Sequence, residues 1–333
     1  MISNYINFCK IFIAFLLLLF LVDVAQGMQD SEDIVITQKR GSDKTSKRRG
    51  KIVDWKGQSL TIHSTGRDRE INNDEIIEVQ TPWSQAYLDG LAALKKGQTR
   101  IAIGQLEAAL GVETRPWAKR IIRAHLIDSY QTIEQHSDAV KQFVQILAED
   151  PNTRFLHLAP LPWTGSGNTL VEQAEKWLEI KEPSVQLIAA SWLVAGPKRD
   201  QAIKLLDELS RDIDARIRFQ AIAQLWRTRT NVNAKQTEVW AGLIQKMPRA
   251  LRAGPLYVLA NAQSQCQQID QAIIGLMRIP ILYPEQRSLS AAALYRSAGL
   301  LHNKGQTKQA NSLLNELISK YPDSFWAQQA NQK

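Results

Sequence analysis

The chain has 333 residues, of which 44% are hydrophobic and 22% charged, and it carries a formal net charge of +8 at pH 7. A chain of this length can bury a large apolar surface, either in two domains or in one elongated array. Its two cysteines, Cys9 and Cys266, exclude a disulfide framework, because Cys9 lies in the N-terminal segment that we expect to be removed.

Residues 1–27 have the layout of a secretory signal peptide. Lys10 precedes an unbroken apolar run at 11–22, and small residues follow it, so we expect cleavage before Met28. The run is shorter than the roughly 20 apolar residues of a permanent membrane helix, and Asp23 interrupts it. We therefore predict an exported protein, periplasmic or secreted, with no transmembrane helix in the mature chain. An uncleaved N-terminal anchor is the alternative.

Residues 28–50 are rich in Asp, Ser, Lys, Gly and Thr, which bury too little apolar surface to fold alone. We expect a flexible basic arm that contributes one strand at 33–37. Its cations attract polyanions, and the candidate polyanion-binding residues are Lys39, Arg40, Lys44, Lys47, Arg48 and Arg49. Interleaved aromatic residues are missing, so we expect an anionic polymer of the envelope rather than nucleic acid. The alternative is a solvated linker.

The sequence takes on the period of β-strands at 51–81. Short apolar runs are separated there by turn residues at 56–57, 65–66 and 72–74. This spacing predicts a small β-rich module, either an antiparallel sheet or an SH3-like barrel of four or five short strands. The sequence leaves open whether this module binds a ligand or only caps the helices that follow.

The period becomes helical after residue 81 and stays so to residue 330. A template recurs there, with apolar residues four and seven positions after a small anchor and a proline 12 to 14 positions after it. The four anchors are Ala102, Ala139, Ala272 and Ala310. Between the second and third anchors the template weakens, although Ala202 and Trp240 mark two plausible units. We expect divergent helical hairpins in this gap and about six hairpins in all.

This template resembles the tetratricopeptide repeat, whose two helices need small residues where they cross and a proline to end the unit. The resemblance covers 82–330 and implies a mainly α protein, an α-α superhelix preceded by the small β module. The combination of signal peptide, β module and repeats resembles secreted bacterial proteins. Arrays of this family have a concave groove, lined by the first helix of each unit, that binds an extended segment or a helix of another protein.

The resemblance also implies which side chains line the groove. They are Tyr87, Asp128, Tyr257, Asn261, Tyr295, His302 and Asn303. Tyrosine offers a large contact area at low entropic cost, and asparagine both donates to and accepts from a peptide backbone. Repeats that clamp a C-terminal carboxylate place lysine where this chain has tyrosine, so that mode of binding is not predicted. The alternative is that these are ordinary surface residues.

Signatures of catalysis are missing from the sequence, which has no phosphate-binding loop, HExxH, CxxC or nucleophile elbow. The five histidines lack metal-ligand spacing. We therefore predict a non-catalytic protein without cofactor or metal. The alternative is an enzyme with a site near His157 in the 150–168 loop. The other interpretation of this loop is that Phe155 and Trp163 plug the end of a hairpin.

These patterns together predict a protein-protein interaction scaffold of the bacterial cell envelope, which binds a peptide or helix of a protein partner in the repeat groove. A function of a different class is the alternative: binding of a polyanion or glycan through the basic arm and the β module.

Overall fold

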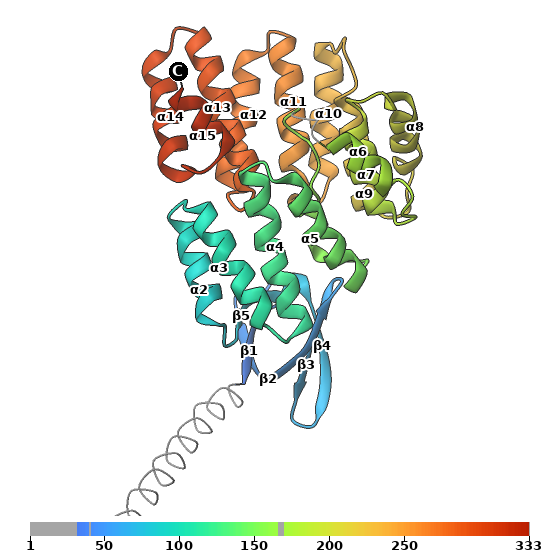
Figure 1. Cartoon of the computed structure of the whole chain (residues 1–333), viewed down its shortest axis with the longest axis vertical. Helices are drawn as coiled ribbons and strands as arrows, with labels where there is room; N and C mark the ends of the chain where they lie inside the picture. The colour runs from blue at the N-terminus through green and yellow to red at the C-terminus, as the bar shows by residue number, and fades with distance from the viewer. Residues whose placement is uncertain (1–31, 40, 166–169, 333) are drawn as a thin grey trace, which may run out of the picture. The chain divides into compact units, whose positions relative to one another are not determined.

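The computed structural model describes residues 32–39, 41–165 and 170–332. The predicted signal peptide at 1–27, the start of the predicted arm and Arg40 therefore lie outside the described residues. The chain divides into two compact units, Met1–Trp83 and Ser84–Lys333. Figure 1 shows strands in the first unit and helices in the second, and each unit is described by itself.

The described part of the first unit contains a five-stranded antiparallel sheet, which confirms the predicted β-rich module. Its strands are β1 (Asp33–Gln38), β2 (Thr45–Lys56), β3 (Ser59–Ser64), β4 (Arg67–Asn72) and β5 (Ile76–Gln80). They lie in the order β4-β3-β2-β1-β5. Alternate side chains point to one face, and the buried apolar set is Val35, Ile52, Trp55, Leu60, Ile62 and Ile71.

The strand expected at 33–37 is present in the described part of the predicted flexible arm, whereas residues 45–50 of that arm form the start of a second strand. Residues 33–38 form β1, and β2 begins at Thr45, well before the predicted start of the module. In the ladder between these strands Ile36 lies opposite Lys47 and Ile34 opposite Arg49. The basic residues thus gain backbone hydrogen bonds while their charged ends stay in water. Composition does not reveal such a strand, because a partner strand supplies the apolar contacts.

The second unit, in its described part, consists of 14 α-helices that pack in sequential pairs, which confirms the predicted helical array. They are α2 (Gln85–Lys95), α3 (Thr99–Val112), α4 (Pro116–Thr132), α5 (His136–Glu149), α6 (Val171–Trp177), α7 (Pro183–Leu193), α8 (Arg199–Leu209), α9 (Ala215–Trp226), α10 (Ala234–Lys246), α11 (Ala253–Gln265), α12 (Ile269–Leu282), α13 (Arg287–Asn303), α14 (Thr307–Lys320) and α15 (Phe325–Asn331). Short 3-10 helices, η2 (Arg154–Leu158) and η4 (Arg249–Leu251), follow α5 and α10.

The four anchor alanines of the template are buried near the N-terminal end of the second helix of each hairpin. They belong to α3, α5, α12 and α14, and none is more than 2% exposed. The apolar residues four positions later, such as Leu106, Phe143 and Leu276, are 0% exposed in three of the four units. A small side chain at each crossing lets the backbones approach, and the larger neighbours then fill the space between the helices.

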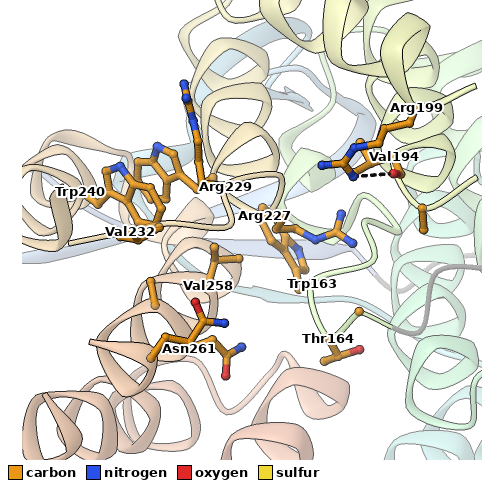
Figure 2. Close-up of a pocket in the computed structure, with 15 residues that line it drawn as sticks. Trp163, Thr164, Val194, Arg199, Arg227, Arg229, Val232, Trp240, Val258 and Asn261 are labelled. Atoms are coloured by element: carbon orange, nitrogen blue, oxygen red, sulfur yellow. Dashed lines mark hydrogen bonds between the residues drawn. The ribbon is translucent and has the colours of Figure 1, made fainter. Parts of the chain in front are cut away.

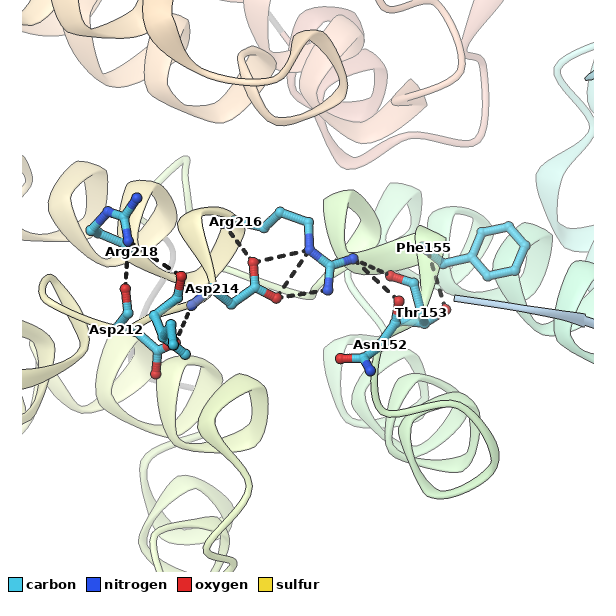
Figure 3. A network of polar contacts seen from close by, with 8 residues as sticks. Asn152, Thr153, Phe155, Asp212, Asp214, Arg216 and Arg218 are labelled. Atoms are coloured by element: carbon cyan, nitrogen blue, oxygen red, sulfur yellow. Dashed lines mark hydrogen bonds and ion pairs between the residues drawn. The ribbon is translucent and has the colours of Figure 1, made fainter. Parts of the chain in front are cut away.

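A network of polar contacts fixes α9 against the segment after α5 (Figure 3). Asp214 caps α9 by accepting the backbone N–H of Arg216 at 2.8 Å, and it pairs with the Arg216 guanidinium at 2.7 Å. That guanidinium also donates to the carbonyl oxygen of Thr153 at 2.7 Å. Burial acts to raise the pKa of Asp214, but the hydrogen bonds and charge of Arg216 outweigh it and lower that pKa. The network thus connects two hairpins that are distant in sequence.

The helical array closes on itself, because its first helices contact its last ones. Helix α4 packs against α13 (Figure 1), and Asp128 Oδ1 accepts the backbone N–H of Arg287 at 3.0 Å. Asp323 accepts the backbone N–H of Arg100 and also pairs with its guanidinium, both at 3.1 Å. A carboxylate from the end of the chain therefore caps α3, whose own N-cap residue makes no side-chain hydrogen bond.

Gly97 permits the close approach at this closing contact. Its φ of +74° lies in the left-handed region, and a Cβ there would stand 2.8 Å from the Lys320 carbonyl oxygen and 2.6 Å from Pro322 Cδ. Only glycine can adopt this positive φ and also leave room for the Lys320–Pro322 backbone without strain. The turn between α2 and α3 is thus shaped to receive the chain at the end of α14.

The buried carboxyl of Asp128 makes the closing contact depend on pH. Burial raises the pKa of Asp128 to about 7, against the opposing effects of the Arg287 charge and N–H. Between about pH 4 and 7 the folded chain therefore holds a proton that the unfolded chain releases. We expect the free energy of unfolding to fall as pH rises through this window, by on the order of 2 kcal/mol between about pH 5 and 8.

The measurement compares urea unfolding of the wild type and Asp128→Asn across this pH range. Asparagine keeps the acceptor oxygen but does not titrate, so the stability difference between the two proteins should change with pH. His125 and His157, whose pKa values burial lowers to about 4, contribute a slope of opposite sign that is common to both proteins and cancels in the difference. A constant difference would show that Asp128 is ionised at both ends of the range.

Candidate partner-binding site

A pocket of about 300 Å³ opens in the middle of the helical array. It lies where the C-terminal ends of α9 and α11 meet α10, the turn between α7 and α8, and the chain at 163–165 (Figure 2). Ligand pockets begin at about this volume, which holds one or two side chains of a partner. Three groups of side chains give it its character: tryptophans, arginines and amides.

Three tryptophans form the apolar wall of the pocket. The rings of Trp226 and Trp240 stack with centroids 4.7 Å apart and planes 5° apart, which joins the end of α9 to α10. Trp163 comes from the chain after η2 and lies against α11, where Gly254 leaves room for its ring. Trp163 packs against a neighbouring helix, as predicted, but it is only partly buried, so part of its side chain faces the pocket.

Three arginines, Arg199, Arg227 and Arg229, lie at the same pocket. Arg199 donates to the carbonyl oxygens of Val194 at 2.9 Å and Thr228 at 3.2 Å. Arg227 donates to the Ser191 carbonyl at 3.3 Å and to the side chain of Gln224. Burial lowers the pKa of Arg227 to about 10, which leaves it charged at neutral pH. In the described part of the chain, none of the three pairs with a carboxylate.

Two amide side chains complete the pocket from α11. Asn261 and Gln265 are four residues apart, so they project from the same side of the helix one turn from each other. Gln265 is exposed and Asn261 is half-buried. Figure 2 shows Asn261 across the pocket from the arginines. Each amide offers both a donor and an acceptor, so the pair matches the polar groups of an extended backbone.

The structure moves three of the predicted groove residues into the interior. Tyr87 and Tyr257 are each 4% exposed, and Asp128 is 9% exposed. The hydroxyl of Tyr87 lies 3.3 Å from Nε2 of His125 on α4. The prediction was wrong here because neighbouring helices cover these positions: Tyr257 packs into the core around α11, and Asp128 is covered where α4 meets α13. Of the seven predicted residues, Asn261 alone reaches the pocket.

The other three predicted residues lie near the end of the array. Tyr295 is half-buried against Trp326 of α15, with ring centroids 5.2 Å apart. His302 and Asn303 are exposed at the C-terminal end of α13. None of the three lines the pocket.

The candidate polyanion-binding residues are spread over two faces of the sheet. Lys47 and Arg49 share one face of β2, whereas Arg48 lies on the other face, opposite Val35. Lys39 and Lys44 are exposed in and beside the connection between β1 and β2. The structure thus brings Lys47 and Arg49 together, and it adds Lys51 to their row.

The alternative catalytic site near His157 gains no partner groups from the fold. Its Nδ1 lies 3.2 Å from the carbonyl oxygen of Arg154, and no hydrogen bond joins it to a carboxylate in the described residues. Burial and the nearby Arg154 charge lower the pKa of His157 to about 4, whereas its hydrogen bond to the Arg154 carbonyl acts to raise it.

No helix in the described part of the chain is long and apolar enough to cross a membrane.

Sequence reasoning missed the arginines and Gln265, and it assigned Trp226 to the core. One signal was available: residues 215–237 hold five basic side chains and no acidic one. Solvated helix faces usually mix both signs of charge, so this imbalance favours cations without a nearby carboxylate. Arg227 and Arg229 fit this expectation, whereas Arg216 pairs with Asp214 just before the run. Their convergence with tryptophans from other hairpins depends on the tertiary fold.

Substitution of Gly254 tests whether Trp163 packs against α11 in the pocket wall. A Cβ at this position would lie 2.1 Å from the Trp163 ring. Gly254→Ala should therefore displace the indole and lower the free energy of unfolding by about 1–3 kcal/mol. In a Trp163→Ala background the same change should be neutral or stabilising, because alanine favours the helix over glycine. Urea unfolding of the four proteins measures this coupling, and additive effects would contradict the contact.

Comparison with known proteins agrees with this architecture at the end of the chain. Residues 292–324 match a family described as the tetratricopeptide repeat. The matched segment runs from α13 through α14, where Leu294, Ala298, Ala310 and Leu317 are buried. No curated protein shows a significant match to the chain. The chain therefore carries a tetratricopeptide repeat, and this match supports its membership of the tetratricopeptide repeat superfamily.

Proposed function

We propose that this protein is a non-catalytic adaptor that binds a segment of a protein partner in the tryptophan-lined pocket. The tetratricopeptide repeat indicates a protein-interaction scaffold. The observation that supports the pocket as its binding site is the stacked pair of Trp226 and Trp240 beside Trp163, with amides on the facing helix. Buried aromatic surface in a preformed pocket is where binding energy concentrates in protein interfaces.

The proposed mode of binding has two parts. A large apolar side chain of the partner enters the pocket and removes the tryptophan surfaces from water. The adjoining backbone of the partner runs past α11, where Asn261 and Gln265 donate to its carbonyls and accept from its N–H groups. Because both contacts use a preformed surface, little of the binding free energy is lost in ordering the adaptor.

We also propose that the adaptor works outside the cytoplasm, in the bacterial envelope or secreted. The support is the sequence at 1–27, which has the layout of a signal peptide. Cell fractionation with N-terminal sequencing of the recovered protein tests this, since export predicts a chain that begins near residue 28.

The double variant Asn261→Ala/Gln265→Ala tests the binding site. Peptides selected by the full chain from a randomised phage-displayed library are synthesised, and their affinities are measured by calorimetry. We expect the double variant to bind them at least about tenfold more weakly, since two hydrogen bonds are lost. His302→Ala/Asn303→Ala is the matched control, because it removes two exposed residues outside the pocket.

Each outcome of this comparison is informative. Weaker binding by the control but not by the pocket variant would move the site to the end of α13. A library that yields no binding peptide would contradict the proposed function. Equal thermal unfolding of the three proteins shows that the losses arise from binding and not from misfolding.

A second candidate function is polyanion or glycan binding by the sheet. Lys47, Arg49 and Lys51 follow one another at two-residue spacing on one exposed face of β2, so their charges lie about 7 Å apart. Heparin serves as a probe of this surface. Its binding should weaken steeply with added salt and be lost in a variant with glutamine at the three positions. If heparin binding changes neither with added salt nor in the glutamine variant, this surface is not the binding site.

A further inference from the structure

The three arginines at the pocket have no negative partner within the described part of the chain. Arg199 and Arg227 use some of their N–H groups on backbone carbonyls and on Gln224, which leaves their charge in place. Arg229 is exposed, and its side chain makes no hydrogen bond or ion pair within the described residues. Other arginines of this unit, such as Arg115 and Arg216, pair with a carboxylate at 2.7 Å. The pocket therefore brings three cations together, and no acidic residue is among those that line it.

The positions of these charges favour a bound anion over ordinary solvation. Arg227 is partly buried, and burial lowers its pKa, so part of its hydration is already lost without an ion pair to replace it. An anion placed between these guanidinium groups would make charge-assisted hydrogen bonds, which are stronger than neutral ones. The field of three cations at a concave surface also raises the local concentration of anions.

The neighbouring groups indicate what carries the anion. Trp163, Trp226 and Trp240 beside the arginines require a large apolar body next to the negative charge. Asn261 and Gln265 stand one turn apart on the opposite side, where they suit the repeating amides of a polypeptide. An inorganic ion would leave the tryptophans and the amides unused.

We propose that the pocket binds a polypeptide segment in which an aspartate or glutamate lies next to a large apolar side chain. This inference rests on the proposed adaptor function and adds the chemistry of the partner to it. The carboxylate lies beside Arg199 and Arg227, Arg229 adds its charge at the edge of the pocket (Figure 2), and the apolar side chain covers the tryptophans. A segment with the same apolar residue but without the acid leaves the arginines unneutralised and binds more weakly.

The experiment uses the peptides selected by the full chain from the randomised phage-displayed library. We expect them to be enriched in an acidic residue beside Phe, Trp, Leu or Ile. Arg199→Gln/Arg229→Gln should reduce their affinity at least about tenfold. Arg229→Gln alone should reduce it less, and it removes no hydrogen bond within the described protein, so it controls for misfolding. Arg278→Gln is the matched control, because Arg278 is an exposed arginine of α12 outside the pocket.

Synthetic variants of one selected peptide distinguish the two sources of a carboxylate. Replacing its Asp and Glu by Asn and Gln should abolish most of the affinity, whereas changing its C-terminus from free acid to amide should have little effect. The reverse result would overturn the side-chain assignment in favour of C-terminal recognition.

The composition of the selected peptides and their affinities for the variants distinguish a failure of this inference from a failure of the adaptor function. Selected peptides that lack acidic residues, and that bind the arginine variants as well as the wild type but lose affinity in Asn261→Ala/Gln265→Ala, would overturn the acidic partner and leave the adaptor intact. Peptides that are insensitive to both sets of variants, or an absence of selected peptides, would overturn both proposals.

Discussion

Close packing of paired helices around small residues is the constraint on which the rest of this structure depends. Ala102, Ala139, Ala272 and Ala310 have almost no exposed surface, and their small side chains let the paired helices pack closely. At the closing contact α4 meets α13. Gly97 then receives the Lys320–Pro322 segment at a distance that no side chain would allow.

Closure changes which surfaces are available for binding. An open array would expose the first helices along a groove, but here Tyr87, Tyr257 and Asp128 are covered. A pocket is open instead between α9, α10 and α11, in the part of the array where the template weakens. There Trp163 inserts beside Gly254, and the Arg216 network holds the preceding segment in place. Irregular stacking leaves a space that regular hairpins would fill.

Two kinds of imperfectly compensated charge occur in the array, and they differ in effect. Asp128 is buried at the closing contact, where desolvation raises its pKa and favours the neutral carboxyl. Arg199, Arg227 and Arg229 keep their charge at an open pocket, because a guanidinium does not lose its proton near neutral pH. The buried carboxyl of Asp128 therefore affects the stability of the fold, whereas the charges of the three arginines can be neutralised by a bound anion. This difference is why the arginines, and not Asp128, point to a partner.

The sequence by itself determined the β module, the helical array and its repeat, because period-two and period-3.6 patterns and the spacing of alanine and proline are local properties of the chain. It did not reveal that the basic segment at 45–50 is a strand, since the apolar contacts of that strand come from β1. The candidate site was likewise predictable only in part. Asn261 and the run of basic residues at 215–237 can be found in the sequence. Their meeting with Trp163 and Gln265 was decided only by the tertiary structure, because small rotations at each helix crossing determine which distant hairpins face one another.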